Sequence, residues 1–288
     1  MNVALQRALS AVDLNFNPPS FPLAQLRECT FEFWGLEGEL TPLDGERDQN
    51  HRMTTADGAS YVLKVSAPGE SEGAVDFQVS ALRHLERHAP DLPVPRVIAS
   101  LKGNDREWIT AADGKRHMVR LLSWIPGTLL SQSKPLRIKA LRSAAAFQAK
   151  LARGLQGFFH PHARHFVAWD IQRALLLEPG VQAWVADDAK ALCADFNARF
   201  QREVLPKLPA LRAQVVHSDG HADNLLRAPG SDEIVGIIDF GDMVHAPLVQ
   251  DLAVTLASFA RHGEMSLENA VAQIEAWNAV LPLSDEEL

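Results

Sequence analysis

The sequence has few cysteines and no long apolar stretch, and each absence argues against a class of protein. Its 288 residues include two cysteines, Cys29 and Cys193, which lie far apart and in no metal-type spacing. This usage is typical of a reducing compartment, and neither thiol is a good candidate nucleophile. No apolar stretch reaches membrane-spanning length, and the first residues lack the hydrophobic region of a signal peptide. We therefore expect a cytoplasmic protein without a membrane partner.

A basic stripe is missing as well. Asp and Glu outnumber Lys and Arg, which gives a formal net charge of −8, and the basic residues form no run. A nucleic-acid partner is therefore not expected. The remaining composition, 47% hydrophobic and 22% charged, is ordinary for a folded protein. The acidic balance suits a cationic or zwitterionic substrate.

The first part of the chain is rich in strand patterns. Residues 51–66 and 106–125 each predict two strands joined at an Asp-Gly turn. Residues 29–36 alternate between polar and apolar and predict a further strand. Between the hairpins, residues 74–88 place Val and Leu side chains at helical spacing. These patterns predict a small β-rich lobe that contains one helix.

The pattern changes after Gly127. Residues 135–160 and 182–204 are helical by period and composition, and more helix is expected from residue 247 onward. Two short apolar strands, AQVVH and EIVGIIDF, flank the segment HSDGHADN at residues 217–224. This second part therefore predicts a mainly helical lobe.

Together the two parts predict an α+β, bilobal fold. The small lobe is expected over residues 1–126 and the helical lobe over residues 127–288. Near the end of the chain, Ser284 and Glu287 have the spacing of a capping box, which opens a helix. We therefore expect the natural chain to continue beyond Leu288.

The segment HSDGHADN fits two different chemistries. In the first, the alternate residues His217, Asp219, His221 and Asp223 hold a metal ion, as in a metal-dependent hydrolase. Alternate residues share a face only if the segment stays extended, and Gly220 in its middle favours a loop. This interpretation is therefore the weaker one.

In the second interpretation, the same letters form the pattern H-x-D-x-x-x-x-N. Asp219 then faces a substrate hydroxyl, and Asn224 supplies an amide oxygen to a metal ion. Asp239 lies fifteen residues after Asn224, at the end of an apolar run, where its carboxylate can hold a hard cation such as Mg²⁺. An orienting carboxylate and two metal-binding side chains are what phosphoryl transfer requires. His217 would then support the loop.

Phosphoryl transfer also needs a cation for the phosphates of the nucleotide. Lys64 lies within the apolar strand YVLKVS of the first lobe. A lysine in such a strand is usually paired or extends its ammonium to solvent. Lys64 follows the Asp-Gly turn of the first lobe, and the carboxylates of Asp219 and Asp239 come later, in the second lobe. This order favours a phosphate-binding role for Lys64.

These motifs resemble the aminoglycoside phosphotransferase/choline kinase superfamily, which has a protein-kinase-like fold. The similarity runs through nearly the whole chain and is most specific where H-x-D-x-x-x-x-N is followed by D-F-G-D. Within the superfamily the chain is most similar to the branch of hydroxylysine kinases and related amino-alcohol kinases. The matching segments are LDGERDQN (43–50), Lys64, LPVPRV (92–97), WIPG (124–127), HSDGHADN (217–224) and IIDFGD (237–242).

The resemblance implies a role for each matching residue. Asp219 is the catalytic residue, and Asn224 and Asp239 bind Mg²⁺. Lys64 contacts the α- and β-phosphates of ATP or GTP. Further implied roles are contacts to the base edge from the backbones of Ser123 and Ile125, and support of the catalytic loop by Asp251 and His217.

One departure from the family pattern affects the lysine. The helix glutamate that usually pairs with the strand lysine is Gln78 here, and an amide can accept a hydrogen bond from Lys64 but forms no ion pair. Glu72 or Asp76 can substitute from nearby.

A second departure affects the phosphate-binding loop at residues 43–50. It has a single glycine, Gly45, and so lacks the usual glycine-rich pattern. Its phosphate contacts are expected from backbone N–H groups and from the side chains of Arg47, Gln49 or Asn50.

The acceptor is expected to be an amino-bearing alcohol such as hydroxylysine, homoserine, ethanolamine or an aminoglycoside. Trp169 and Asp170 lie where this superfamily builds its substrate pocket and can meet an ammonium group, and Asp242 is a third candidate. A tryptophan between two helices and an N-cap aspartate is the plainer interpretation of the same pair.

Two other functions stay open beside the kinase. A pseudokinase or nucleotide-binding module is suggested by Gln78, although every base and metal position is filled. A protein kinase is disfavoured by HSD in place of HRD and by the lack of an A-P-E segment after IIDFGD. We therefore expect an enzyme that transfers the γ-phosphoryl group of ATP or GTP to a small amino alcohol with the help of Mg²⁺. The oligomeric state is left open.

Overall fold

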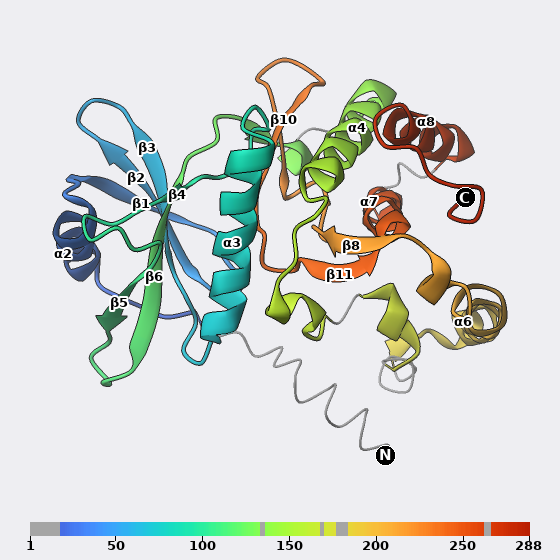
Figure 1. Ribbon diagram of the computed structural model, residues 1–288, viewed down its shortest axis with the longest axis horizontal. Helices are drawn as coiled ribbons and strands as arrows, with labels where there is room; N and C mark the ends of the chain where they lie inside the picture. The colour runs from blue at the N-terminus through green and yellow to red at the C-terminus, as the bar shows by residue number, and fades with distance from the viewer. Residues whose placement is uncertain (1–17, 133–135, 168–169, 177–183, 262–265) are drawn as a thin grey trace. The chain divides into compact units, whose positions relative to one another are not determined.

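The chain folds into two compact units, which Figure 1 shows as a ribbon. The computed structural model describes residues 18–132, 136–167, 170–176, 184–261 and 266–288. One unit, the sheet unit, contains the described residues from Pro18 to Gly127 together with Gly236–Ile238. The other, the helical unit, contains Thr128–Val235 and Asp239–Leu288.

The sheet unit is built on an antiparallel sheet with the strand order β1-β2-β3-β6-β4, and β5 also pairs with β6. Both predicted hairpins are confirmed, since β2 pairs with β3 and β5 pairs with β6 around the two Asp-Gly turns. The strands are β1 (Gly38–Leu43), β2 (Gln49–Thr55), β3 (Ser60–Val65), β4 (Val97–Ile98), β5 (Glu107–Thr110) and β6 (Arg116–Ser123).

The two faces of this sheet differ in polarity because side chains alternate along each strand. Leu63 and Val65 of β3 are fully buried and share a core with Phe33 of α2 (Leu23–Trp34). Lys64, which lies between them, is on the opposite face. Figure 1 shows α3 (Glu72–His88), the predicted helix, on the other side of the sheet from α2. The lysine therefore lies on the face that α3 covers.

The prediction of a strand over residues 29–36 is wrong, because most of this segment belongs to α2. The buried side chains of α2 include Leu26, Cys29 and Phe33, which recur at helical spacing once the residues before Cys29 are counted. A window of eight residues is too short to separate the two periods. The sequence patterns also do not predict β1, an edge strand that contains Pro42.

The helical unit has its core where α4 and α8 pack together. Ala145, Ala149 and Ala152 form one buried face of α4, and Trp277 of α8 is completely buried in the same cluster. Within the described residues, the predicted helices after Gly127 are confirmed with narrower bounds. They are α4 (Ile138–Gly154), α6 (Asp187–Arg199), α7 (Leu248–Arg261) and α8 (Leu267–Asn278).

Short strands complete this part of the chain. The predicted strands AQVVH and EIVGIIDF are confirmed as β8 and β10. β8 pairs with β11, and a second small sheet has the order β10-β9-β7. The strands are β7 (Thr128–Leu129), β8 (Ala213–Val216), β9 (Leu225–Arg227), β10 (Ile234–Ile237) and β11 (Val244–Pro247). Short helical turns lie at Leu130–Gln132, Pro161–Arg164, Ile171–Arg173, Phe200–Val204 and Leu208–Ala210.

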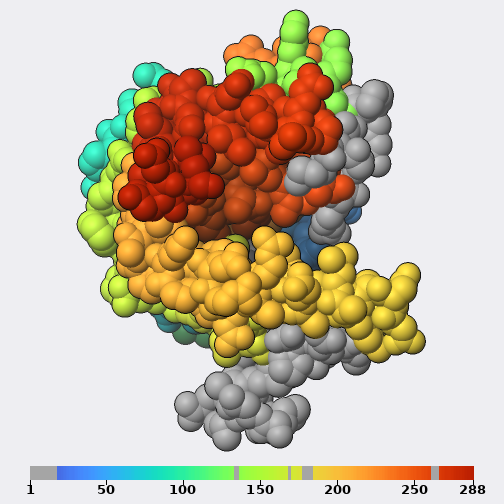
Figure 2. All heavy atoms as spheres, turned by 90° about the vertical axis from the view of Figure 1, so that its right-hand side faces the viewer, coloured from blue at the N-terminus to red at the C-terminus, as the bar shows by residue number. Residues whose placement is uncertain are grey.

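Helix α6 contributes little to this core. It has no buried residue, and it exposes Leu192 and Phe196 one turn apart. Figure 2 shows this segment in yellow on the surface of the helical unit.

The end of the described chain shows part of the expected capping box. The Glu287 carboxylate accepts a hydrogen bond from the Ser284 N–H at 2.8 Å, and Arg212 Nε donates to the same carboxylate at 3.0 Å.

Among the described helices, none combines the length and the apolar character needed to cross a membrane.

Candidate active site

The segment 217–224 forms the connection between β8 and β9, and its first residues are buried. His217 packs its ring edge against Phe240, with 4.9 Å between the ring centroids. Ser218 is also buried and has a φ of 61°. This left-handed conformation costs a non-glycine residue about 1 kcal/mol or more, so neighbouring groups must hold it in place.

Asp251 of α7 holds this strained backbone. Its Oδ1 accepts a hydrogen bond from the Ser218 N–H at 2.7 Å, and Gln250 Nε2 donates to Ser218 Oγ at 3.3 Å. Burial raises the pKa of Asp251 to about 7; hydrogen bonds from the backbone of Ser218 and His217 lower it, and the Asp219 charge raises it. The contacts of this buried carboxylate are thus with the backbone of the loop.

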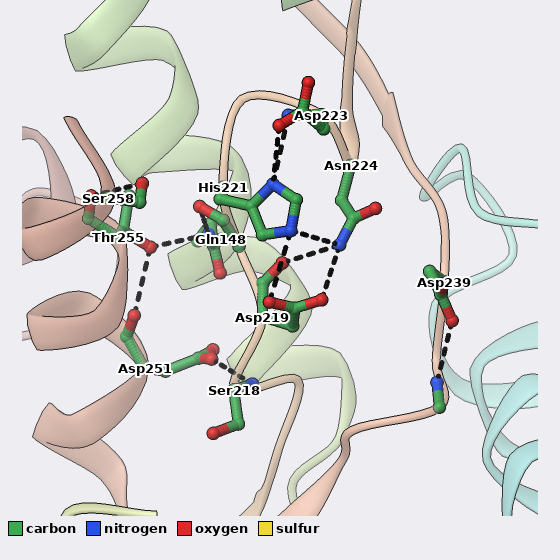
Figure 3. A network of polar contacts seen from close by, with 12 residues as sticks. Gln148, Ser218, Asp219, His221, Asp223, Asn224, Asp239, Asp251, Thr255 and Ser258 are labelled. Atoms are coloured by element: carbon green, nitrogen blue, oxygen red, sulfur yellow. Dashed lines mark hydrogen bonds and ion pairs between the residues drawn. The ribbon is translucent and has the colours of Figure 1, made fainter. Parts of the chain in front are cut away.

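A second buried anchor comes from α4. Gln148 has no exposed surface, and its Nε2 donates to the carbonyl oxygen of Gly220 at 3.0 Å and to Thr255 Oγ1 at 2.6 Å. A Cβ atom on residue 220 would lie 1.4 Å from this nitrogen, so any larger residue would displace the Gln148 amide from its hydrogen bonds. The loop is therefore fixed by α4 and α7 at two points close together in the sequence, as Figure 3 shows.

Asp219 lies between these two anchored positions, and its side chain is 19% exposed. Asn224 Nδ2 donates to Asp219 Oδ2 at 2.7 Å and to the Asp219 carbonyl oxygen at 3.0 Å. His221 Nε2 lies 3.3 Å from Asp219 Oδ1. Figure 3 shows both side chains converging on the one carboxylate. A carboxylate held in this way and still reachable from solvent can orient a hydroxyl and accept its proton.

The histidine of this group responds to the carboxylates around it. Its hydrogen bond with Asp219 raises the pKa of His221, burial opposes the rise, and the charges of Asp219, Asp223 and Asp239 add to it. The Asp223 N–H donates to His221 Nδ1 at 3.1 Å. The neutral ring therefore carries its proton on Nε2, the nitrogen that faces Asp219.

Asp239 follows β10 and brings a second carboxylate to the group. It is exposed and has a φ of 61°, and its Oδ1 accepts a hydrogen bond from the Gly241 N–H at 3.2 Å. Its charge contributes to the raised pKa of His221, although Figure 3 shows no direct contact between the two side chains. The turn thus presents the carboxylate beside the loop that carries Asp219.

Asn224 and Asp239 are suited to a hard divalent cation. The amide nitrogen of Asn224 bonds to Asp219, and Figure 3 shows its amide oxygen turned away from that bond. Asp239 offers exposed carboxylate oxygens. Mg²⁺ is typically bound by one or two protein oxygens, with phosphate oxygens and water as its other ligands. The donor set therefore fits a metal ion that arrives with a nucleotide.

The alternative metal site, formed by alternate residues of the loop, is not supported by this geometry. His217 is buried against Phe240, whereas Asp223 is exposed. In the described parts of the chain, no group of three or more His, Cys, Asp or Glu side chains is arranged to hold a metal ion.

In the sheet unit, Lys64 belongs to a cluster of charged side chains. Lys64 Nζ lies 3.5 Å from Asp48 Oδ2. Arg120, its cross-strand neighbour on β6, places Nη2 at 3.2 Å from the same oxygen. Two cations thus share one carboxylate oxygen, and such a cluster attracts an anion such as a phosphate group.

The predicted partners of Lys64 make other contacts. Gln78 Oε1 accepts a hydrogen bond from Arg120 Nη2 at 2.8 Å, not from Lys64. Glu72 and Asp76 both pair with Arg106, at 3.5 and 3.1 Å, and do not substitute as partners of the lysine.. The carboxylate beside Lys64 comes instead from the loop between β1 and β2.

That loop depends on Gly45. A Cβ atom at this position would lie 2.3 Å from Asn50 Nδ2 and 2.6 Å from the Asp48 carbonyl oxygen. Asn50 Nδ2 donates to the carbonyl oxygen of Asp44 at 3.4 Å, so this amide closes the loop on itself. Arg47 lies near enough to Glu70 to lower its pKa, against the stronger effect of burial, which raises it.

The two residues expected at the base edge lie at the end of β6 and just after it. The Ser123 N–H donates to the carbonyl oxygen of Arg96 at 2.8 Å, and Ser123 Oγ accepts from the Arg96 N–H at 2.8 Å. The Ser123 N–H is therefore in use, which leaves its carbonyl oxygen as the group for a base. Ile125, two residues on, is partly buried.

The expected substrate residues are less well placed. Trp169 lies outside the described residues. Asp170 is 1% exposed, and its Oδ1 accepts from the Gln172 N–H at 3.1 Å as the N-cap of a short turn, while Arg173 Nε lies 3.4 Å from Oδ2. This geometry favours the N-cap interpretation. Asp242 lies partly buried in the turn after Phe240.

Three residues of these networks were missed by the sequence analysis. Arg120 interrupts the apolar run MVRLL of β6, and that pattern is the signal that could have found it, whereas Gln148 is one of several polar residues of α4 and carries no such signal. Asp48 is one of three acidic residues in LDGERDQN, and nothing in the sequence singles it out.

The family model of a phosphotransferase enzyme family matches residues 39–283, which is most of the chain. The chain belongs to this family. Hydroxylysine kinase of Danio rerio is 26% identical over 283 residues, covering 93% of this chain and 79% of that protein.

Two solved structures have a similar fold. A microcompartment-associated aminopropanol kinase has a TM-score of 0.73 at 17% identity, covering 92% of this chain and 83% of its own. An amicoumacin kinase in complex with AMP-PNP and Ca²⁺ has a TM-score of 0.69 at 16% identity, covering 97% of this chain and 81% of its own. The chain is therefore a small-molecule kinase of mixed α+β, protein-kinase-like fold, which phosphorylates an alcohol group.

Proposed function

We propose that this kinase transfers the γ-phosphoryl group of ATP or GTP to the hydroxyl of a small amino alcohol or hydroxy amino acid, with Mg²⁺ bound by Asn224 and Asp239. The observation that carries the proposal is the geometry of Asn224. Its amide nitrogen fixes the Asp219 carboxylate at 2.7 Å, and its amide oxygen is turned away for a cation. One side chain thus links the acceptor-orienting carboxylate to the metal site.

Asp219 is the catalytic residue of this proposal. Its carboxylate orients the acceptor hydroxyl and takes the proton as the new oxygen–phosphorus bond forms, while the bond to the β–γ bridging oxygen breaks and the nucleoside diphosphate leaves. A loose transition state needs little base strength, so orientation contributes more than basicity. Bound Mg²⁺ would neutralise the charge on the phosphate oxygens.

The nucleotide is held by groups of the sheet unit in this proposal. Lys64 contacts the α- and β-phosphates, and the backbone N–H groups of the loop at residues 43–50 contribute further donors. The Ser123 carbonyl oxygen and the Ile125 N–H meet the edge of the base. Backbone groups of this kind serve adenine or guanine, so both nucleotides belong in the test.

The acceptor class follows from the relatives. Two of these relatives are named for their substrates, hydroxylysine and aminopropanol. Both compounds carry an amino group and a hydroxyl. The net charge of −8 is compatible with an acceptor that bears an ammonium group. Asp242 is the remaining described candidate for that ammonium, since the carboxylate of Asp170 is buried in its own turn.

The experiment measures release of nucleoside diphosphate from ATP and from GTP with Mg²⁺. The acceptors are hydroxylysine, homoserine, ethanolamine and an aminoglycoside, and each of the first three is paired with its analogue lacking the amino group. We expect turnover that needs both the hydroxyl and the amino group. Asp219→Asn should lower kcat about 100- to 10,000-fold and leave nucleotide affinity nearly unchanged.

The matched control is Asp232→Asn, a carboxylate in the β9–β10 hairpin that pairs with Arg137. It should keep the kinetics of the unmodified protein. Normal turnover in Asp219→Asn would remove that residue from its role. A folded protein that binds neither nucleotide would overturn the whole proposal.

A further inference from the structure

The partner of the nucleotide-binding lysine in this chain comes from an unexpected place. Asp48 lies in the phosphate-binding loop, directly before β2, and it contacts both Lys64 and Arg120 through Oδ2. On helix α3, the two carboxylates expected as partners of Lys64, those of Glu72 and Asp76, pair with Arg106. The negative charge beside Lys64 is thus supplied by the loop.

Arg120 is built into this arrangement as a central connection. It is 3% exposed, and a buried guanidinium needs a partner for each of its donors. Its Nη1 donates to Ser66 Oγ at 2.8 Å, and its Nη2 donates to Gln78 Oε1 at 2.8 Å and to Asp48 Oδ2 at 3.2 Å. The side chain therefore joins β6, the end of β3, helix α3 and the phosphate-binding loop.

A second carboxylate near the cluster does not replace Asp48. Burial raises the pKa of Glu70, and the charge of Asp48 raises it further. Asp48 is the acidic side chain that makes direct contacts with the two cations, at 3.5 Å from Lys64 and 3.2 Å from Arg120. It is also 14% exposed, so its charge remains partly solvated.

We propose that Asp48 and Arg120 are positioning residues for Lys64. Arg120 fixes the Asp48 carboxylate and the Gln78 amide in one place, and Asp48 then holds the Lys64 ammonium in the orientation that meets the nucleotide phosphates. The loop carboxylate thereby positions the Lys64 ammonium in place of a carboxylate at position 78 on α3. This inference rests on the proposed function, in which Lys64 binds the phosphates.

The decisive variants are Asp48→Asn, Asp48→Glu and the double variant Asp48→Asn/Gln78→Glu. Asp48→Asn removes the charge with little change of shape, so kcat/KM for the nucleotide should fall about 10- to 100-fold, as expected for a misplaced phosphate-binding group. Affinity for AMP-PNP should fall as well. Asp48→Glu keeps the charge, so it should retain most of the kcat/KM for the nucleotide and most of the affinity for AMP-PNP. Gln78→Glu places a carboxylate beside Arg120 and should restore at least part of the loss in the double variant.

Two controls separate positioning from general damage. Asp105→Asn removes a carboxylate that pairs with Arg83 of α3 on an exposed part of the same unit, and it should leave kcat and KM unchanged. Arg120→Lys keeps the charge but cannot reach three acceptors at once, so it should resemble Asp48→Asn. Thermal melting of each variant shows whether it is folded.

Three results would overturn the inference. Unchanged kinetics and AMP-PNP affinity in a folded Asp48→Asn protein would show that the carboxylate does not position the lysine. Tighter AMP-PNP binding in that variant would show that Asp48 only competes with the phosphates. A failure of Gln78→Glu to restore either quantity would show that the helix and loop carboxylates are not interchangeable. AMP-PNP affinity needs no turnover, so it tests the inference even where no acceptor is phosphorylated, and the absence of turnover in the unmodified protein would count against the proposed function alone.

Discussion

The loop at residues 217–224 and the Lys64 cluster hold their polar side chains in different ways. The loop is fixed through its backbone: Asp251 accepts from the Ser218 N–H, and Gln148 donates to the Gly220 carbonyl oxygen. The cluster around Lys64 is fixed through side chains, with Asp48 and Arg120 at its centre. Both are stabilised by buried polar groups, but only the second depends on opposite charges.

This difference predicts different sensitivities. A loop held through its backbone should respond to the protonation of Asp251 and to the space around Gln148. A cluster held by ion pairs should respond to the loss of one charge or of one donor, because the remaining buried charge is then uncompensated. Substitutions in the two places can therefore break one arrangement and leave the other intact.

The largest expected effect concerns the protonation of Asp251. Its pKa is raised from 3.8 to about 7 in the folded protein, so between these values the folded state binds more protons than the unfolded state. The free energy of unfolding should therefore fall as pH rises through this window, by a total on the order of 4 kcal/mol from this group. Urea titrations at about pH 5 and about pH 8 measure the larger part of this fall, because about pH 5 already lies within the window.

Asp251→Asn supplies the comparison. The amide oxygen can still accept from the Ser218 N–H, and the amide does not titrate, so most of this pH dependence should disappear. Asp285→Asn, at an exposed position, should keep the profile of the unmodified protein. An equally steep profile in Asp251→Asn would assign the pH dependence to other groups.

The next effect is steric and tests the second anchor of the loop. Gly220→Ala brings a methyl group to 1.4 Å from Gln148 Nε2, inside a buried site, and should destabilise the protein by about 3 kcal/mol. Gln148→Ala alone removes two hydrogen bonds and should cost about 2 kcal/mol. The double variant relieves the clash, so its loss should be clearly smaller than the sum. Additive losses, measured by urea denaturation, would show that the two positions do not meet.

The same contrast explains what the sequence could predict. Asp219, Asn224 and the strained Ser218 belong to one stretch of eight residues, so a local motif is enough to find the loop. The hairpins carry equally local signals in their Asp-Gly turns. The strand predicted at residues 29–36 is wrong because a short alternating window also fits the helical period that continues from Leu26.

The anchors could not be predicted, because their partners lie far away in the sequence. Arg120 bonds to Asp48 across 72 positions and to Gln78 across 42, and Gln148 bonds to Thr255 across 107. Only the fold brings these pairs together. A sequence can mark Arg120 as an unusual polar residue in an apolar strand, but it does not name its partners, and it does not single out Gln148 among the polar residues of α4.

A smaller effect separates the two cations of the cluster. Arg120→Met removes a buried guanidinium that serves three acceptors and should lower the free energy of unfolding by about 2 kcal/mol. Lys64→Met removes one contact at 3.5 Å from a side chain that is 15% exposed, and should cost less than about 1 kcal/mol. Equal losses in urea denaturation would contradict the view that Arg120 contributes more to the stability of the fold than Lys64 does.

The smallest effect is expected where a charge pair lies on the surface of the helical unit. Arg142 of α4 and Glu275 of α8 are 3.0 Å apart, but their side chains are 46% and 62% exposed. Solvent and salt screen such a pair, so Glu275→Gln should cost no more than about 0.5 kcal/mol, and less at high salt.

The helices are held together instead by Trp277 against the alanine face of α4, so Trp277→Ala serves as the positive control and should cost about 3 kcal/mol or more. Melting temperatures at low and high salt measure the loss of stability in both variants. A loss of more than about 1 kcal/mol in Glu275→Gln would mean that exposed charges hold this unit together as the buried ones hold the Lys64 cluster.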